Sequence, residues 1–193
     1  MPRSGRRIGW RAWLVVTAAL GGLLTGLGYA AVSAAPMGLG TDGPTAVSGT
    51  EASAVFMIGD RTIRQVRYSD GATLVYTFRL LNSQALPMTI RGISPEQAEE
   101  RLFSYVSLKD DSGHTRFTVP GNGAVEVNLR LKMGGCESLS ARAGSFAHRV
   151  SLVTGRLGVS AGTATILLPE EIHTGSPREA FCPNSTAKSR PPG

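Results

Sequence analysis

Residues 121–132, "GNGAVEVNLRLK", carry the clearest strand pattern in the chain. Apolar and polar side chains alternate along them: Val125, Val127, Leu129 and Leu131 against Glu126, Asn128, Arg130 and Lys132. A period of two places all the apolar groups on one face of an extended strand, as in a sheet with one buried face. The Pro120–Gly123 cluster before it is typical of a turn. This stretch therefore predicts a β fold with a core on one side of the sheet.

Two further segments repeat the pattern. In "ATLVYTFRLLN", residues 72–82, one face is continuously apolar: Leu74, Tyr76, Phe78 and Leu80. In "SQALPMTIRGI", residues 83–93, Leu86, Met88 and Ile90 recur with the same period. A turn at residues 82–84 would join the two as a hairpin. The same reasoning places further strands at residues 54–58, 62–68, 102–109, 115–119, 146–153 and 163–168, with a turn at 109–114.

One short helix is expected after residue 93. Ser94 is a good N-cap, Pro95 suits the first helical position, and Gln97 completes a capping box with Ser94. Ile93 and Ala98 have the spacing of a hydrophobic staple. The sequence therefore predicts about two helical turns between strands.

About seven to nine short strands separated by Gly/Pro turns predict an all-β fold, an antiparallel immunoglobulin-like sandwich with this one helix. The segments "YTFRLLNSQALPMTIRGI" (76–93) and "VPGNGAVEVNLRL" (119–131) resemble bacterial immunoglobulin-like or fibronectin-III-like ectodomains, which are membrane-anchored or secreted. The resemblance covers residues 54–168 and implies the architecture, and no binding residue is transferred from it. Antibody domains carry a tryptophan in the core of the sandwich. This chain departs from them because its two tryptophans, Trp10 and Trp13, both lie outside this region.

The N-terminal residues 1–35 form a leader that predicts export. Four arginines precede an uncharged run of 24 residues, 12–35, and the next positive charge is Arg61. This asymmetry places the N-terminus in the cytoplasm and the rest outside. The run is long enough for a transmembrane helix, which needs about 20 residues. It either stays as a single-pass signal anchor or is cut as a signal peptide near Ala34, in which case the chain is secreted.

The charge of the chain does not indicate nucleic-acid binding. The net charge is +6, but four of the 20 basic residues lie in the leader, so 16 face 14 acidic residues in the exported part. A nucleic-acid interface needs a concentrated basic patch. The nearest candidate, Arg61, Arg64 and Arg67, is interpreted as a set of charges that guards an exposed strand edge.

Composition divides the exported part into three segments. Residues 36–52 are rich in Gly, Pro, Thr and Ser, which predicts a flexible linker. Residues 53–182 form the predicted sandwich domain, long enough for one core. Residues 183–193, "PNSTAKSRPPG", are expected to be a disordered tail.

No pattern of catalytic residues is present, and the chain is predicted not to be an enzyme and to carry no cofactor. The sequence lacks the G-x-S-x-G motif of hydrolases and a glycine-rich phosphate loop. A blue-copper site needs two histidines and a cysteine, usually with an axial methionine. Met133 lies near Cys136, but no histidine follows the cysteine closely, so no metal ligand is assigned. An enzyme site assembled from distant residues is the remaining alternative.

The two cysteines, Cys136 and Cys182, are predicted to form a disulfide. A cysteine could also be a nucleophile, a metal ligand or a lipid attachment site, but a lipidated cysteine must directly follow the leader. Outside the cytoplasm an even pair of cysteines is most simply a disulfide. The bond would close a loop of about 46 residues, which contributes ~4 kcal/mol in the chain-entropy model.

Together these features predict a non-enzymatic cell-envelope protein whose sandwich domain mediates protein interaction or assembly. The partner surface is expected in the loops Ser94–Leu102 and Gly134–Ser145, because loops on a rigid scaffold often carry recognition. The partners expected are the membrane, through residues 12–35, and an envelope protein of unknown identity. The alternative is an envelope copper carrier that uses Met133, His148 or His173.

The disulfide gives the first testable prediction. Thiol labelling of the unreduced, denatured chain should modify neither Cys136 nor Cys182, and reduction before labelling should modify both. Two reactive thiols without reduction would contradict the pairing.

Overall fold

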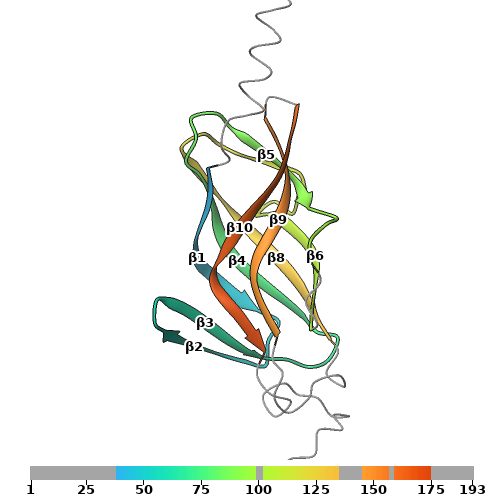
Figure 1. Ribbon diagram of the computed structural model, residues 1–193. Coiled ribbons are helices and arrows are strands. Elements are labelled where there is room, and N and C mark those ends of the chain that lie inside the picture. The colour runs from blue at the N-terminus through green and yellow to red at the C-terminus, as the bar shows by residue number, and fades with distance from the viewer. Residues whose placement is uncertain (1–37, 99–101, 135–144, 157–158, 175–193) are drawn as a thin grey trace, which may run out of the picture. The chain divides into compact units, whose positions relative to one another are not determined.

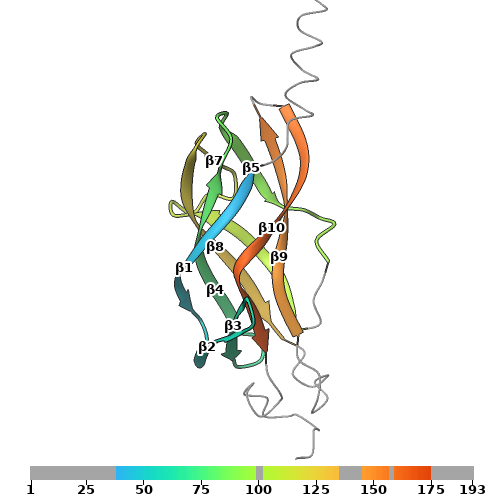
Figure 2. The same ribbon diagram turned by 60° about the vertical axis from the view of Figure 1, so that its left-hand side comes forward.

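The computed structural model describes residues 38–98, 102–134, 145–156 and 159–174, and these residues are all-β (Figures 1 and 2). They belong to the unit Met37–Gly193, which is separate from Met1–Pro36. The described residues form ten strands: β1 (Leu39–Ser48), β2 (Ala52–Ile58), β3 (Arg61–Arg67), β4 (Thr73–Asn82), β5 (Met88–Ile93), β6 (Phe103–Asp110), β7 (Phe117–Val119), β8 (Gly123–Met133), β9 (Ser145–Arg156) and β10 (Val159–Thr174).

The strands form two sheets with a common core. The order is β1-β4-β8-β6 in the four-stranded sheet and β2-β3-β10-β9-β5-β7 in the six-stranded sheet. Buried apolar residues of both sheets make one core cluster. The predicted all-β, two-sheet arrangement is confirmed. The strand number exceeds the predicted seven to nine, and one pair, β3 with β10, is parallel where all pairs were expected to be antiparallel.

The two strands with the clearest sequence pattern lie side by side at the centre of the four-stranded sheet. β4 and β8 pair antiparallel, with Tyr76 opposite Leu129 and Phe78 opposite Val127. All four of these side chains are fully buried. The predicted alternation is therefore confirmed in both strands, and it supplies the centre of the core.

The predicted hairpin between residues 74–81 and 86–90 is wrong. Both edges of β4 are already paired, with β1 and β8, and β5 belongs to the six-stranded sheet. The chain crosses between sheets at Asn82, whose buried side-chain amide donates to the carbonyls of Leu86 (2.9 Å) and Pro120 (3.2 Å). Periodicity identifies strands but does not identify their partners. The predicted pairing of β4 with β5 and its observed pairing with β1 and β8 bury the same face of β4.

No helix forms in the described residues of the predicted helical segment, Ser94–Ala98. The Gln97 amide donates to the Ser94 carbonyl (3.0 Å) and the Glu96 amide donates to the Ser94 hydroxyl (3.2 Å), which makes a turn at Pro95 and Glu96. The Gln97 side chain accepts a hydrogen bond from the Ser151 amide at 2.6 Å and so ties the turn to β9. Capping residues stabilise a turn by the same bonds that begin a helix.

The flexible linker predicted at residues 36–52 is wrong for most of its length. Leu39–Ser48 form β1, which pairs with β4 on both sides of an irregularity between Asp42 and Ala46. Leu39 and Val47 also pack against the core. The Gly/Pro-rich composition hides this strand, because its order comes from the edge of β4, whose backbone groups need hydrogen-bond partners.

Several predictions lie outside the described residues. They are the leader helix at residues 12–35 with its cleavage point near Ala34, the pair Cys136 and Cys182, and the tail 183–193. Within the described part of the chain, no helix has the length and apolar character needed to span a membrane.

The central strand pair gives the second prediction. Leu129→Ala should lower the free energy of unfolding by about 2–5 kcal/mol, because Leu129 is fully buried and the surrounding core can only partly collapse. Leu167→Ala is the matched control, since Leu167 is 67% exposed, and it should change stability by less than about 0.5 kcal/mol. Urea unfolding of the purified chain measures both, and equal effects would contradict the assigned core.

Candidate interaction surface

The outermost strand of the six-stranded sheet, β2, is exposed along its whole length. It pairs antiparallel with β3, and its other edge has no strand partner among the described residues. Four successive apolar side chains on it are exposed: Val55 (48%), Phe56 (38%), Met57 (70%) and Ile58 (56%). An exposed apolar edge strand is a template for pairing with another chain.

Both faces of β2 are apolar because its residues point alternately to the two sides of the sheet. We call the side of the six-stranded sheet turned away from the four-stranded sheet its outer face. Phe56 lies opposite Ile63 and Ile58 lies opposite Arg61, all on this outer face. Val55 and Met57 point to the inner side. β1, the edge strand of the other sheet, reaches β10, where the Thr41 hydroxyl donates to the Leu167 carbonyl at 2.7 Å. The four-stranded sheet therefore ends before it covers β2.

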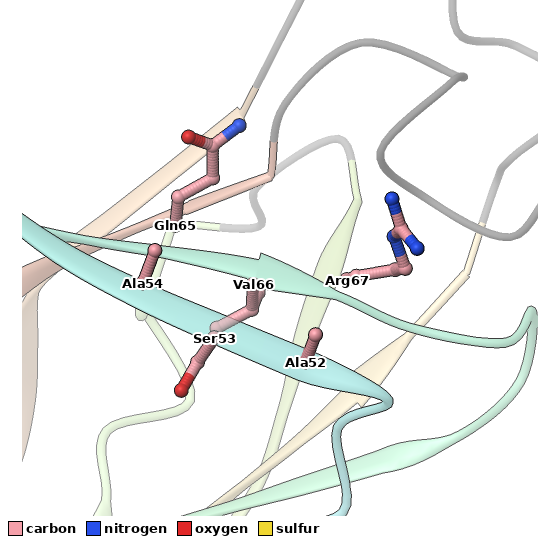
Figure 3. A pocket seen from close by; sticks show the side chains of 6 residues that line it. All are labelled: Ala52, Ser53, Ala54, Gln65, Val66 and Arg67. Carbon is pink, nitrogen blue, oxygen red and sulfur yellow. The ribbon is translucent and has the colours of Figure 1, made fainter.

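A shallow hollow of about 300 Å³ lies on the first half of β2 and the end of β3. Ala52 and Ala54 point to the same side as Gln65 and Arg67, whereas Ser53 and Val66 point the other way (Figure 3). The two alanines lie opposite the two longer side chains in the β2–β3 register. The part of the lining that β2 contributes consists of three small residues, Ala52, Ser53 and Ala54.

A buried polar network fixes the β2–β3 hairpin to both sheets. Arg64 of β3 donates two hydrogen bonds to the Glu170 carboxylate of β10, at 2.6 and 3.1 Å. A third nitrogen of Arg64 reaches the Ser53 hydroxyl of β2 at 3.2 Å. The Tyr76 hydroxyl of β4 donates to Glu170 at 3.3 Å and so connects the second sheet. Burial first, and then the charge of Glu170, raises the pKa of Tyr76, which keeps this donor protonated.

A second ion pair lies on the outer face. Arg61 donates to the Glu171 carboxylate through two nitrogens, one of them at 2.6 Å. Hydrogen bonding from Arg61 lowers the pKa of Glu171, with smaller contributions from the charges of Arg61, His148 and His173. The prediction that the arginines guard a strand edge is wrong for Arg61 and Arg64, because β3 lies between β2 and β10 and both guanidinium groups bind glutamates of β10.

The structure separates the candidate metal ligands. His173 stacks on Phe146 with ring centroids 4.5 Å apart, and His148 lies two residues further along β9 on the same outer face. Met133 is fully buried in the core, on the four-stranded sheet. In the described ranges, no group of three or more His, Cys, Asp or Glu side chains is placed to hold a metal ion.

The loops expected to carry recognition are only partly described. In the first, Ser94 is buried and Gln97 is bonded to β9, so these side chains support the sheet. In the second, residues 135–144 lie outside the described part. The β2 surface was missed, although "AVFMI" (54–58) carries a signal in the sequence. Its apolar residues do not alternate with polar ones, which indicates either burial on both faces or an exposed edge.

Comparison with known proteins identifies no family for this chain. No protein-family model and no curated protein matches it. Among solved structures, it is similar to the cupredoxin domain of amoB from Nitrosocaldus yellowstonii, with 16% identity and a TM-score of 0.26. The match covers 63% of this chain and 65% of the cupredoxin chain, so this chain spans just under two thirds of the length of the cupredoxin chain. A TM-score this low supports neither a shared fold nor a shared copper function.

The buried network gives the third prediction. Glu170→Gln should lower the free energy of unfolding by about 3–5 kcal/mol, because the Arg64 charge, with its side chain only 15% exposed, loses its partner. Glu171→Gln is the matched control on the adjacent residue, and it should have a much smaller effect, because the Arg61 side chain is 52% exposed and solvated. Urea unfolding compares the two, and a larger loss for Glu171→Gln would contradict the assigned roles.

Proposed function

We propose that this chain is a non-enzymatic cell-envelope protein whose extracytoplasmic, immunoglobulin-like sandwich domain mediates protein interaction or assembly through β2. The observation that carries the proposal is the apolar exposure of β2 on both faces, at a sheet edge with which no described strand pairs. Addition of a strand to such an edge is a common mode of protein recognition.

The other edge strands support this assignment by contrast. Natural sheets protect their edges by short strands, prolines, charges and irregular register. β1 carries Pro44 and a register shift, β6 carries a register shift and Lys109, and β7 has three residues. β2 has seven residues without a proline, a charge or a register shift. The absence of protection at this one described edge is the reason that we assign binding to it.

The envelope location rests on the leader. The arginines before the uncharged run 12–35 favour a cytoplasmic N-terminus and an exported domain, either anchored or released near Ala34. The chain enters β1 at one end of the domain, and the β2–β3 hairpin lies toward the other end in both views (Figures 1 and 2).

The alternative function, a copper carrier, receives less support. Among its proposed ligands, Met133 is buried in the core on the four-stranded sheet, whereas His148 and His173 lie on the outer face of the six-stranded sheet. Stoichiometric copper or zinc in chain purified from the envelope would favour this alternative.

The fourth prediction tests the surface. Affinity capture from envelope fractions should recover the same bound proteins with the wild-type chain and with Leu167→Asp. These proteins include other copies of the chain. Met57→Asp should lose them, because a charge placed at the 70%-exposed Met57 makes an apolar strand contact unfavourable. Leu167 is the control because it is 67% exposed on the same sheet. Equal recovery with all three chains, or recovery of the chain only in the cytoplasmic fraction, would refute the proposed function.

A further inference from the structure

We propose that β2 pairs antiparallel with β2 of a second copy of this chain, about a two-fold axis at Val55, so that two six-stranded sheets become one continuous sheet. This inference rests on the proposed function of β2 as an interaction surface and names the partner. A two-fold contact of this kind uses the same surface on both copies, so the strand must be complementary to itself.

The two halves of β2 have complementary sizes. Residues 52–54 are Ala-Ser-Ala and residues 56–58 are Phe-Met-Ile, with Val55 between them. An antiparallel pairing centred on Val55 places Phe56 of one copy opposite Ala54 of the other, Met57 opposite Ser53, and Ile58 opposite Ala52. Each large side chain then meets a small one, the arrangement by which packed layers interdigitate. A parallel pairing would place large residues against large ones and small against small ones.

The hollow lies where these large side chains would arrive. Directly opposite residues of an antiparallel pair share a face of the sheet. Phe56 and Ile58 of the second copy therefore fall on the outer face beside Ala54 and Ala52. These two alanines belong to the lining of the hollow, which also includes Ser53, Gln65, Val66 and Arg67. Because the axis is two-fold, the same packing occurs at both ends of the pair. Two apolar side chains exposed in each copy would therefore contact the half of β2 that lines the hollow in the other copy.

Electrostatics and the edge of the strand permit this contact. No residue of Ala52–Ile58 is charged, so a strand placed against its own copy meets no like charge. Ser53 is held by Arg64 on the inner side, which fixes the position of the strand before any partner arrives. The unpaired backbone groups of β2 supply the hydrogen bonds of the new ladder.

The size of the contact predicts reversible association. Stable protein interfaces bury about 1,200–2,000 Å² in total, and one seven-residue strand from each copy gives a contact at or below the low end of that range. We therefore expect a concentration-dependent equilibrium between monomer and dimer. A two-fold contact closes at two copies, so larger assemblies are not expected from it.

The fifth prediction is a disulfide test of the register. Val55 lies on the proposed axis and faces itself, and the Cα separation of directly opposite residues, about 4.5–5.5 Å, falls in the range that a disulfide spans. Mild oxidation of the full-length Val55→Cys chain should therefore give a covalent dimer at least tenfold above the wild-type background. Wild type reports any cross-link through Cys136 or Cys182. Leu167→Cys, at a similarly exposed site, is the matched control and should stay at that background.

Sedimentation equilibrium of the purified full chain provides the second measurement. Wild type and Leu167→Lys should dimerise reversibly, and Met57→Lys should weaken the association at least tenfold. The proposal is overturned if wild type stays monomeric, if it forms an open ladder of oligomers, or if Val55→Cys cross-links no more than Leu167→Cys. A monomer that still captures another envelope protein, or phospholipid vesicles, in a Met57-dependent way would overturn the self-pairing. If the monomer captures another envelope protein in this way, the proposed function of β2 still holds. If no capture depends on Met57, both the self-pairing and the proposed function are refuted.

Discussion

The unequal width of the two sheets is the constraint on which the architecture and the proposed function both depend. Four strands cannot cover six, so the six-stranded sheet must extend beyond the shared core on at least one side. The central pair β4–β8 buries all of its apolar face except Val125, which is partly buried, and the sandwich is well formed there. β2 lies two strands beyond β10, the strand that β1 contacts. Its apolar residues are therefore left exposed by the described strands of both sheets.

An overhanging hairpin could easily be mobile, and the Arg64–Glu170–Tyr76 network explains why this one is held. The network joins residues of β3, β10 and β4, and Arg64 also reaches β2. A buried ion pair adds little net stability compared with an apolar packing of equal volume, but each partner strongly constrains the position of the other. The network therefore fixes the position of the β2–β3 hairpin more than it adds to the net stability of the fold. An edge strand that is already held in position loses less conformational entropy when it binds a partner.

The sequence predicts local features of this fold well and long-range features poorly. The alternation in residues 125–131 and 74–80 identifies β8 and β4, and the turn at residues 109–114 is present, with the Asp110 amide bonded to the His114 carbonyl. β1 was missed because its order comes from a neighbour and not from its own composition. Arg61 and Arg64 were misassigned because their glutamates lie 110 and 106 residues away. The proposed interaction surface on β2 was missed because an apolar run looks the same in sequence whether it is buried or exposed.

The parallel pairing of β3 with β10 has a consequence for the order of folding. β3 is among the first strands synthesised, but its partner β10 is the last described strand of the domain. Until β10 is complete, β3 has only β2 beside it, and Arg64 has no carboxylate to bind. Contacts over such long sequence separations slow folding and prolong the exposure of unpaired edges. The β2–β3 hairpin, whose outer strand we propose serves assembly, is therefore also exposed to aggregation along the edge of β3 while the chain is incomplete.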